Sequence, residues 1–297
     1  MAAKILRGTE TSAQIREELR GRVDRLRSQG VLPGLGVVLV GEDPASVSYV
    51  TAKAKGAEEV GIAEETVRLP ATTPEAEILD VVGRLNADPR FHGVLVQLPL
   101  PRHVDPERII DRISPDKDVD AFHPVNVGRL LRGEPCPFPP TPHGVVQMLT
   151  RNGYDPSGRH VVICGRSNLV GKPLAAILVQ KKKGANATVT ICHTGTRNLP
   201  SLTRQAEILV AAMGSPRAIT ADMIVPGTIV IDVGVNRVPD TTAPKGFRLV
   251  GDCDFQAMKE VAEAITPVPG GVGPMTVTML LQNVVESAER ELALRAA

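Results

Sequence analysis

The stretch HVVICGRSNLVGKPLAAIL (residues 160–178) decides the fold, because it combines an apolar strand, a glycine turn and an amphipathic helix in one unbroken segment. Backbone N–H groups at such a turn, together with the helix N-terminus behind it, bind phosphate. The usual dinucleotide fingerprint G-x-G-x-x-G is absent, since only Gly165 and Gly171 are present. By itself the segment therefore predicts a strand, a glycine turn and a helix in the layout that binds phosphate.

Similar apolar runs recur along the chain and alternate with helix-like segments. They are GLGVVLVG (34–41), HGVLVQLPLP (92–101), RHVVICG (159–165), ATVTICH (187–193), AEILVAAMG (206–214) and TIVIDVGVN (228–236). This alternation is typical of parallel α/β units, and runs so uniformly apolar predict strands whose sheets are covered on both faces. The fold class predicted is α/β.

The chain length of 297 residues favours two domains. The stretch RGEPCPFPPTPHG (132–144) contains five prolines and is the best candidate for a linker at the domain boundary. The last amphipathic segment, TVTMLLQNVVESAERELAL (276–294), follows a Gly/Pro-rich loop and could pack against either domain.

Composition excludes several classes of protein. The net charge is +1, and no apolar run approaches the length of a membrane span, which argues against nucleic-acid or membrane partners. Four scattered cysteines form no C-x-x-C pair and no metal-like group with histidine, so we expect no metal and a reducing compartment. The start MAAKILRGTE lacks a targeting pattern, and we expect a cytoplasmic protein.

Charge near the glycine turn indicates the kind of ligand. Residues 156–206 contain no Asp or Glu but eight cations: Arg159, Arg166, Lys172, Lys181, Lys182, Lys183, Arg197 and Arg204. The second strand of this unit ends in Cys192-His193-Thr194, without the acidic residue that commonly holds the ribose 2′-hydroxyl of NAD. With Arg166 in the first loop, the pattern suits a 2′-phosphate and hence NADP. A surface that is basic by chance is the alternative.

A lysine in the stretch SVSYVTAKAKGAEEV (46–60) is the first candidate for catalysis. Asp43-Pro44 predicts the start of a helix, with a core face formed by Val47, Val50, Ala54 and Ala57. Tyr49 and Lys53 are an (i, i+4) pair on the flank of this face, so we expect Lys53 to be partly buried and without an acidic partner. Such an environment favours an amine that transfers protons, although a lysine that extends its stem to solvent is the alternative.

Gln97 stands where the apolar run 93–96 meets proline, so it should lie at the carboxyl end of a strand, where open α/β sheets bind ligands. A neutral amide can accept a hydrogen bond from an ammonium or donate one to an amine. A polar strand terminus bonded to backbone is the alternative.

Asp116, Asp118 and Asp120 alternate in SPDKDVDAFHPVNVGRL (114–130), a pattern usual for solvated turns or helix caps.

Four stretches together carry a family resemblance: YVTAKAKGAEEVGI (49–62), GVLVQLPLP (93–101), PDKDVDAFHPVNVGRL (115–130) and TPVPGGVGPMTVTMLLQN (266–283). In order and over essentially the whole chain, the sequence resembles the bifunctional methylenetetrahydrofolate dehydrogenase/methenyltetrahydrofolate cyclohydrolase family. The resemblance implies a folate-binding catalytic domain (1–140 and 277–297), a Rossmann-like NADP-binding domain (141–276), a cleft between them, and a homodimer.

The resemblance also implies roles for individual residues. Lys53 resembles the catalytic lysine, Tyr49 the ring that packs on the folate, Gln97 the residue that tunes the lysine, and Asp120 the carboxylate that holds the pterin. Residues expected to line the folate site or contact the cofactor are Gly270 and Gly273 for the folate, and Gly165, Arg166, Ser167, Thr194 and Val235 for NADP. Pro140 departs from the family pattern, which commonly has cysteine there, so no thiol role is assumed.

The implied activity is NADP-dependent oxidation of 5,10-methylenetetrahydrofolate, followed by hydrolysis of the methenyl product to 10-formyltetrahydrofolate, within one-carbon metabolism and purine biosynthesis. Two alternatives stay open. A different NADP-linked dehydrogenase on a similar frame would leave the set Tyr49, Lys53, Gln97 and Asp120 as coincidence. A non-catalytic nucleotide-binding module would bind NADP without turnover of a folate.

Overall fold

The computed structural model describes residues 2–243 and 246–296. The chain forms two compact units: unit 1 comprises Met1–Ser12 and Thr141–Thr276, and unit 2 comprises Ala13–Pro140 and Val277–Ala297. The boundary between the units at Pro140 and Thr141 lies within the proline-rich stretch 132–144. Residues 133–139 of this stretch connect α5 (Pro124–Arg132) to α6 (Pro140–Arg151). Among the described residues, every helix is too short or too polar to span a lipid bilayer.

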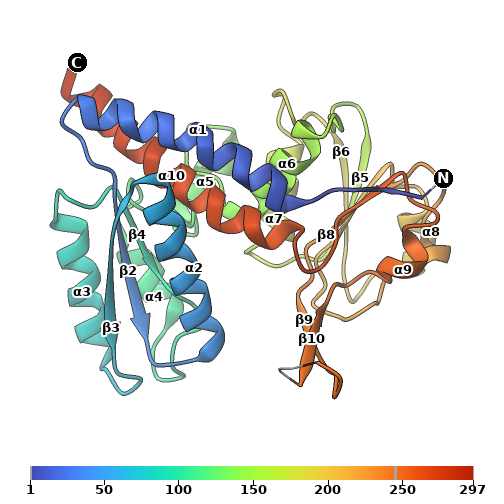
Figure 1. The fold of residues 1–297 in the computed structure, drawn as a ribbon, viewed down its shortest axis with the longest axis horizontal. Coiled ribbons are helices and arrows are strands. Elements are labelled where there is room, and N and C mark those ends of the chain that lie inside the picture. The colour runs from blue at the N-terminus through green and yellow to red at the C-terminus, as the bar shows by residue number, and fades with distance from the viewer. Residues whose placement is uncertain (1, 244–245, 297) are drawn as a thin grey trace. The chain divides into compact units, whose positions relative to one another are not determined.

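Unit 2 is built on a three-stranded parallel sheet in the order β3-β2-β4. Its strands are β2 (Gly34–Val40), β3 (Ala63–Leu69) and β4 (Gly93–Val96). Helix α2 (Pro44–Val60) and helix α3 (Glu75–Ala87) lie on opposite sides of the sheet (Figure 1). All residues of β2 are buried because both faces of this central strand are covered. Strand β3, whose sequence AEETVRL is charged and partly exposed, forms an edge and was not among the predicted strands.

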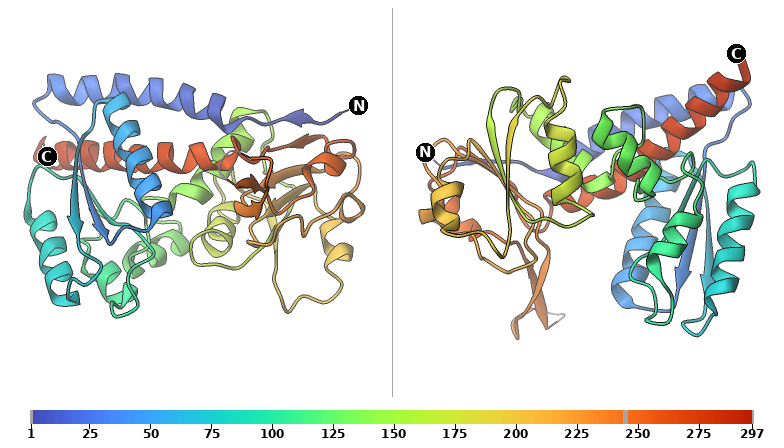
Figure 2. Two further views of the ribbon diagram at one scale, coloured as in Figure 1. Left: turned by 60° about the horizontal axis from the view of Figure 1, so that its bottom comes forward. Right: turned by 180° about the vertical axis from the view of Figure 1, so that it is seen from behind.

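Three further segments complete unit 2. Helix α4 (Pro106–Arg112) packs beside α3, and the portions of α1 (Gly8–Ser28) and α10 (Val272–Ala296) within this unit run side by side (Figures 1 and 2). Arg22 forms a two-pronged hydrogen bond to Glu289, at 2.9 and 2.6 Å, which joins the two helices. Gly56 of α2 lets this helix approach α10, because a Cβ there would lie 3.1 Å from Leu281. Residues 277–296 of the last helix therefore belong to unit 2.

Unit 1 contains a six-stranded sheet in the order β1-β11-β8-β7-β5-β6, in which every neighbouring pair is parallel. Its strands are β1 (Lys4–Ile5), β5 (His160–Cys164), β6 (Thr188–Cys192), β7 (Ile208–Ala211), β8 (Ile229–Asp232) and β11 (Ala264–Ile265). The six apolar runs of the sequence each contain a strand of one of the two sheets, and the predicted fold class is confirmed. The N-terminal strand pairs with β11, so residues 1–12 group with 141–276 rather than with the residues that follow them.

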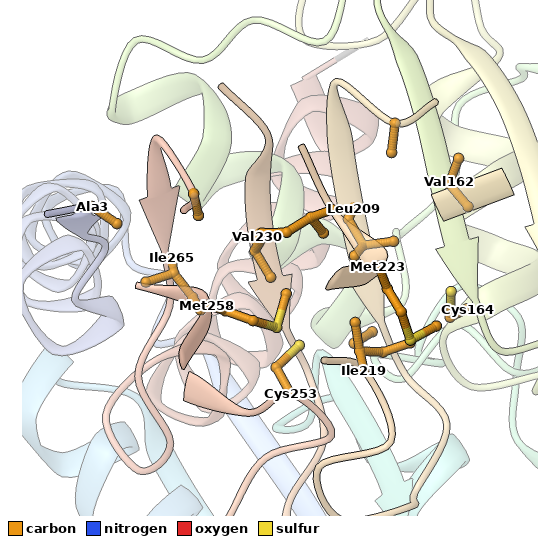
Figure 3. Close-up of a cluster of buried hydrophobic side chains, with 14 of the residues drawn as sticks. Ala3, Val162, Cys164, Leu209, Ile219, Met223, Val230, Cys253, Met258 and Ile265 are labelled. Atoms are coloured by element: carbon orange, nitrogen blue, oxygen red, sulfur yellow. The ribbon is translucent and has the colours of Figure 1, made fainter. Parts of the chain in front are cut away.

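One face of this sheet carries a core cluster whose side chains come from the strands and from short helices (Figure 3). Val162, Leu209 and Val230 of successive strands meet Met223 of η1 (Ala221–Met223) and Met258 of α9 (Phe255–Met258). Helix α7 (Gly171–Leu178) connects β5 with β6, and α8 (Leu199–Thr203) precedes β7. An antiparallel hairpin of β9 (Asn236–Pro239) and β10 (Phe247–Val250) follows β8. The loops of unit 1 that follow the carboxyl ends of the parallel strands lie outside this core cluster.

Candidate functional site

Helix α2 places Lys53 in the buried interior of unit 2. The helix begins as predicted: Pro44 is its first residue, and the Asp43 carboxylate accepts a hydrogen bond of 2.8 Å from the Ser46 N–H. Its buried face differs from the predicted one, since Val47 and Ala54 are only half-buried whereas Lys53 is 8% exposed. The stripe that faces the core is Ser46, Val50, Lys53, Gly56, Ala57 and Val60. Lys53 therefore lies on the core face and not on its flank.

Gln97 receives the buried amine. The Lys53 Nζ donates to Gln97 Oε1 at 3.0 Å. The other half of the amide is also fixed, because Gln97 Nε2 donates to the Leu98 carbonyl at 2.7 Å and the Gln97 backbone N–H donates to Val38 at 2.8 Å. The side-chain oxygen is thereby oriented toward the lysine from the carboxyl end of β4. A fixed neutral acceptor can serve a nitrogen that gains and loses protons.

The Asp120 carboxyl is electrostatically coupled to the same amine, although the close partner of Lys53 is the neutral Gln97 amide. Burial raises the pKa of the Asp120 carboxyl, the positive charge of Lys53 opposes this rise, and the charge of Asp118 adds to it. Tyr49, one helical turn before Lys53, is 46% exposed and presents its ring to solvent. Unit 2 thus brings together a buried amine, an amide, a half-buried carboxyl and an exposed aromatic ring.

The loop that carries Asp120 is held by Asp118, which the sequence grouped with its neighbours as a solvated turn. Only Asp116 is exposed; Asp118 is 2% exposed and accepts hydrogen bonds from the His123 N–H at 2.9 Å and Asn126 Nδ2 at 3.0 Å. Burial raises the pKa of Asp118, and these hydrogen bonds oppose the rise. Asn283 of α10 donates to the Val119 carbonyl at 2.8 Å, which anchors the backbone between Asp118 and Asp120.

Unit 1 gathers the predicted cofactor residues at one edge of its sheet. Because β5, β6, β7 and β8 are parallel, the loops after their carboxyl ends share an edge. Gly165, Arg166 and Ser167 follow β5, Thr194 follows β6, and Val235 follows β8. The side chains of the last four are exposed. The strand order in the sheet places β5 between β6 and β7, which is the position where such sheets bind dinucleotides.

The turn between β5 and α7 requires glycine at two positions. Gly165 has a φ of 140°, and a Cβ there would lie 2.1 Å from the Ala212 carbonyl oxygen. A Cβ on Gly171 would lie 2.1 Å from the Gly165 oxygen. This close backbone packing precedes the N-terminus of α7, and Arg166 and Lys172 supply positive charge beside it. The residues present fit the pyrophosphate and phosphate groups of a dinucleotide.

The two glycines expected to line the folate site lie before and at the start of α10, in unit 1. Gly270 has a φ of 96° with open space where a Cβ would be, and its carbonyl accepts a hydrogen bond of 3.3 Å from the Thr9 N–H. Gly273 is exposed and likewise has open space beside its Cα. Both positions leave backbone accessible to a flat ligand.

A surface hollow of about 410 Å³ lies elsewhere in unit 2, at the amino ends of its strands. Its lining includes Leu32, Glu64, Arg90 and Phe91. Lys53 and Gln97 lie toward the opposite, carboxyl ends and take no part in it. Within residues 2–243 and 246–296, no cluster of three His, Cys, Asp or Glu side chains could hold a metal ion.

Two parallel α/β units, one with a nucleotide-binding edge and one with a buried amine, define a two-domain dinucleotide-dependent enzyme. Two family models match: the tetrahydrofolate dehydrogenase/cyclohydrolase catalytic domain over residues 6–120, and its NAD(P)-binding domain over residues 139–292. The chain belongs to the tetrahydrofolate dehydrogenase/cyclohydrolase family, which confirms the predicted family.

Individual relatives cover the whole chain. The bifunctional protein FolD of Dehalococcoides mccartyi (strain CBDB1) is 55% identical over 296 residues, which are 99% of each protein. The crystal structure of bifunctional FolD from Campylobacter jejuni superposes with a TM-score of 0.92 at 43% identity, over 98% of this chain and 100% of that one. The Trypanosoma brucei FolD structure, complexed with NADP cofactor and an inhibitor, gives a TM-score of 0.92 at 36% identity, over 98% and 99% of the two chains.

The coupling between Lys53 and Asp120 gives a first prediction. Lys53→Met removes the positive charge that lowers the pKa of Asp120, so this pKa should rise further above its ordinary value. The measurement is a pH titration of the Asp120 carboxyl carbon by NMR, with the signal assigned from Asp120→Asn. Lys55→Met, on the exposed side of α2, is the control and should leave the Asp120 titration in place. An identical Asp120 titration in wild type and Lys53→Met would contradict the coupling.

Proposed function

We propose that this chain oxidises 5,10-methylenetetrahydrofolate to 5,10-methenyltetrahydrofolate with NADP, and then hydrolyses the product to 10-formyltetrahydrofolate. The observation that carries the proposal is the buried Lys53 amine, hydrogen-bonded to the Gln97 amide and within the field of Asp120. Family membership supports both activities. In this proposal unit 2 supplies the folate chemistry and unit 1 supplies the cofactor edge together with Gly270 and Gly273.

The oxidation needs little covalent chemistry from the protein. A bound NADP⁺ would supply the acceptor for the hydride of the methylene carbon between folate N5 and N10. The protein's contribution is orientation, which can account for a large part of such a rate. Tyr49 would pack its exposed ring on the folate, and the half-buried Asp120 carboxyl would hydrogen-bond the pterin. Gly165, Arg166, Ser167, Thr194 and Val235 would hold the cofactor.

The hydrolysis needs a proton to move. Water adds to the methenyl carbon, the carbon–nitrogen bond to N5 breaks, and one proton is released as 10-formyltetrahydrofolate forms. Lys53 would take a proton from the attacking water and return it to N5 as that bond opens. The fixed Gln97 oxygen at 3.0 Å would keep the amine aimed during both transfers.

The second prediction tests the amine directly. Lys53→Met should lower cyclohydrolase activity by roughly a hundredfold to ten-thousandfold, which is the usual contribution of a general acid–base group. The fold should survive, because a methionine of similar length can occupy the same buried site. The assay follows the disappearance of methenyltetrahydrofolate absorbance, and circular dichroism checks folding.

Lys55→Met, two residues along the same helix and exposed, is the matched control and should hydrolyse at the wild-type rate. If Lys53→Met also hydrolysed methenyltetrahydrofolate at that rate, the proposed role of the amine would be refuted.

The third prediction concerns NADP preference. Arg166→Gln removes the exposed cation proposed to bind the 2′-phosphate, so KM for NADP should rise by about tenfold to a hundredfold while KM for NAD changes little. Steady-state oxidation of methylenetetrahydrofolate with each cofactor measures both constants. Lys183→Gln, which removes an exposed cation before the amino end of β6, should leave both constants unchanged. A preserved ratio of the two constants in Arg166→Gln would rule out the assignment.

We further propose that the chain acts in the cytoplasm as a homodimer, on the basis of the family resemblance. Sedimentation equilibrium at micromolar concentration should return twice the 31.6 kDa mass of one chain. A mass of 31.6 kDa at all concentrations would exclude a stable dimer. Fractionation of the producing cells, with recovery in the membrane pellet, would argue against the compartment.

A further inference from the structure

Two buried carboxylates, Asp232 and Asp252, lie at the nucleotide-binding edge of unit 1. Asp232 ends strand β8 and is 2% exposed, and Asp252, which follows β10, is fully buried. Burial of a carboxylate is costly unless hydrogen bonds compensate it. The partners of these two groups therefore show what they hold.

Asp252 accepts hydrogen bonds from a short run of backbone. Its Oδ2 accepts from the Met213 N–H at 2.6 Å and the Gly214 N–H at 3.0 Å. Its Oδ1 accepts from the Ser215 N–H at 2.9 Å and from Asn236 Nδ2 at 2.9 Å. Successive N–H groups that converge in this way form an anion-binding concavity. In this chain an internal carboxylate occupies that concavity after β7.

Asp232 holds the segment that carries Asp252. Its Oδ1 accepts from the Gly234 N–H and from the Asp252 N–H, both at 3.0 Å. Its Oδ2 accepts from the Cys253 N–H at 2.9 Å. The two carboxylates together tie three segments to one another: 213–215 after β7, 234–236 after β8, and 252–253. Burial raises the pKa of Asp232 to about 6, and these backbone bonds oppose the rise.

Two glycines make room for this arrangement. A Cβ on Gly234 would lie 2.3 Å from the Asp252 Cγ, and a Cβ on Gly251 would lie 1.8 Å from the Asp232 Oδ2. Real Cβ atoms do not approach so closely, so each carboxylate occupies space that a side chain would otherwise fill. The glycines are an observation independent of the hydrogen bonds, and they place both acids against the same backbone.

We propose that Asp252, held by Asp232, is a positioning residue for the nucleotide cofactor. Asp232 accepts from the Gly234 N–H and Asp252 accepts from the Asn236 side chain, so the pair fixes both neighbours of Val235. Asp252 also fixes residues 213–215 at the neighbouring strand end. The Asp252 carboxylate occupies the concavity after β7, so a phosphate cannot bind there. The glycine turn between β5 and α7 remains as the phosphate position. This inference rests on the proposed function, in which Val235 and the β5–α7 turn contact NADP.

The experiment compares Asp252→Asn with wild type. An asparagine replaces one oxygen by an NH₂ group that faces two N–H donors, so two of the four hydrogen bonds are lost. KM for NADP in methylenetetrahydrofolate oxidation, and Kd for NADPH by fluorescence titration, should rise about tenfold or more. Hydrolysis of methenyltetrahydrofolate without NADP should stay within about twofold of wild type, since that reaction needs no cofactor and its proton transfer is assigned to Lys53 and Gln97 of unit 2.

Asp254→Asn is the matched control. Asp254 caps α9 two residues away by accepting from the Ala257 N–H, and an asparagine can make the same bond. Its KM for NADP should equal that of wild type. A wild-type KM and Kd in Asp252→Asn would overturn the proposal. Equal losses of both activities, in step with a lowered folded fraction, would show a general structural role and would also overturn it.

If Asp252→Asn does not fold, Asn236→Ala provides the second test. It removes one of the four donors and leaves the carboxylate and three backbone bonds in place. A smaller rise in KM for NADP, with methenyl hydrolysis preserved, supports the proposal, and an unchanged KM overturns it. Wild-type protein that binds no NADPH would refute the proposed function itself, an outcome separate from any difference between the variants.

Discussion

The hydrogen bond between Lys53 and Gln97 is the constraint on which unit 2 depends. A buried ammonium loses its hydration, and an isolated one would destabilise the helix that carries it. The 3.0 Å contact to a neutral amide supplies one acceptor, and the field of Asp120 supplies part of the missing charge. Gln97 is neutral, and among the described residues Asp120 forms no close ion pair with the amine. The amide and the nearby carboxyl therefore compensate part of the cost of burying the amine.

This arrangement depends on parallel strands. Strand β2 leads into α2, which carries Lys53, while β4 runs alongside β2 in the same direction and ends at Gln97. The residues after two neighbouring strand ends thus reach the same edge of the sheet. In unit 1 the four neighbouring parallel strands β5 to β8 have the same geometry. The glycine turn, Thr194 and Val235 therefore lie at one edge of that sheet. In unit 2 the site combines a side chain of helix α2 with groups at the end of β4 and on a loop, whereas in unit 1 loops alone supply the predicted contacts.

The sequence predicted these features wherever they depend on local patterns. Apolar runs predicted six of the parallel strands, β2 and β4 to β8, and Asp43-Pro44 predicted the start of α2. Strand β3 was not predicted, because its charged, partly exposed sequence AEETVRL contains no apolar run. The buried face of α2 differs from the predicted one because it includes Lys53, and a pattern of apolar residues cannot place a lysine on a buried face. Asp118 was missed for a related reason: its partners His123 and Asn126 are visible only once the loop has folded.

Asp232 and Asp252 show the same limit over a longer range. Met213 precedes Asp252 by 39 residues, and no spacing rule links an acid to amides so distant. Their partners also explain how acids can lie beside a site for an anionic ligand. Amide N–H groups compensate both carboxylates, so the cations of the preceding segment, among them the exposed Arg166, are not consumed in ion pairs with them. A phosphate at the β5–α7 turn is then near positive charge and helix N–H groups. The oxygens of the buried acids are occupied by hydrogen bonds from the N–H groups of the neighbouring loops.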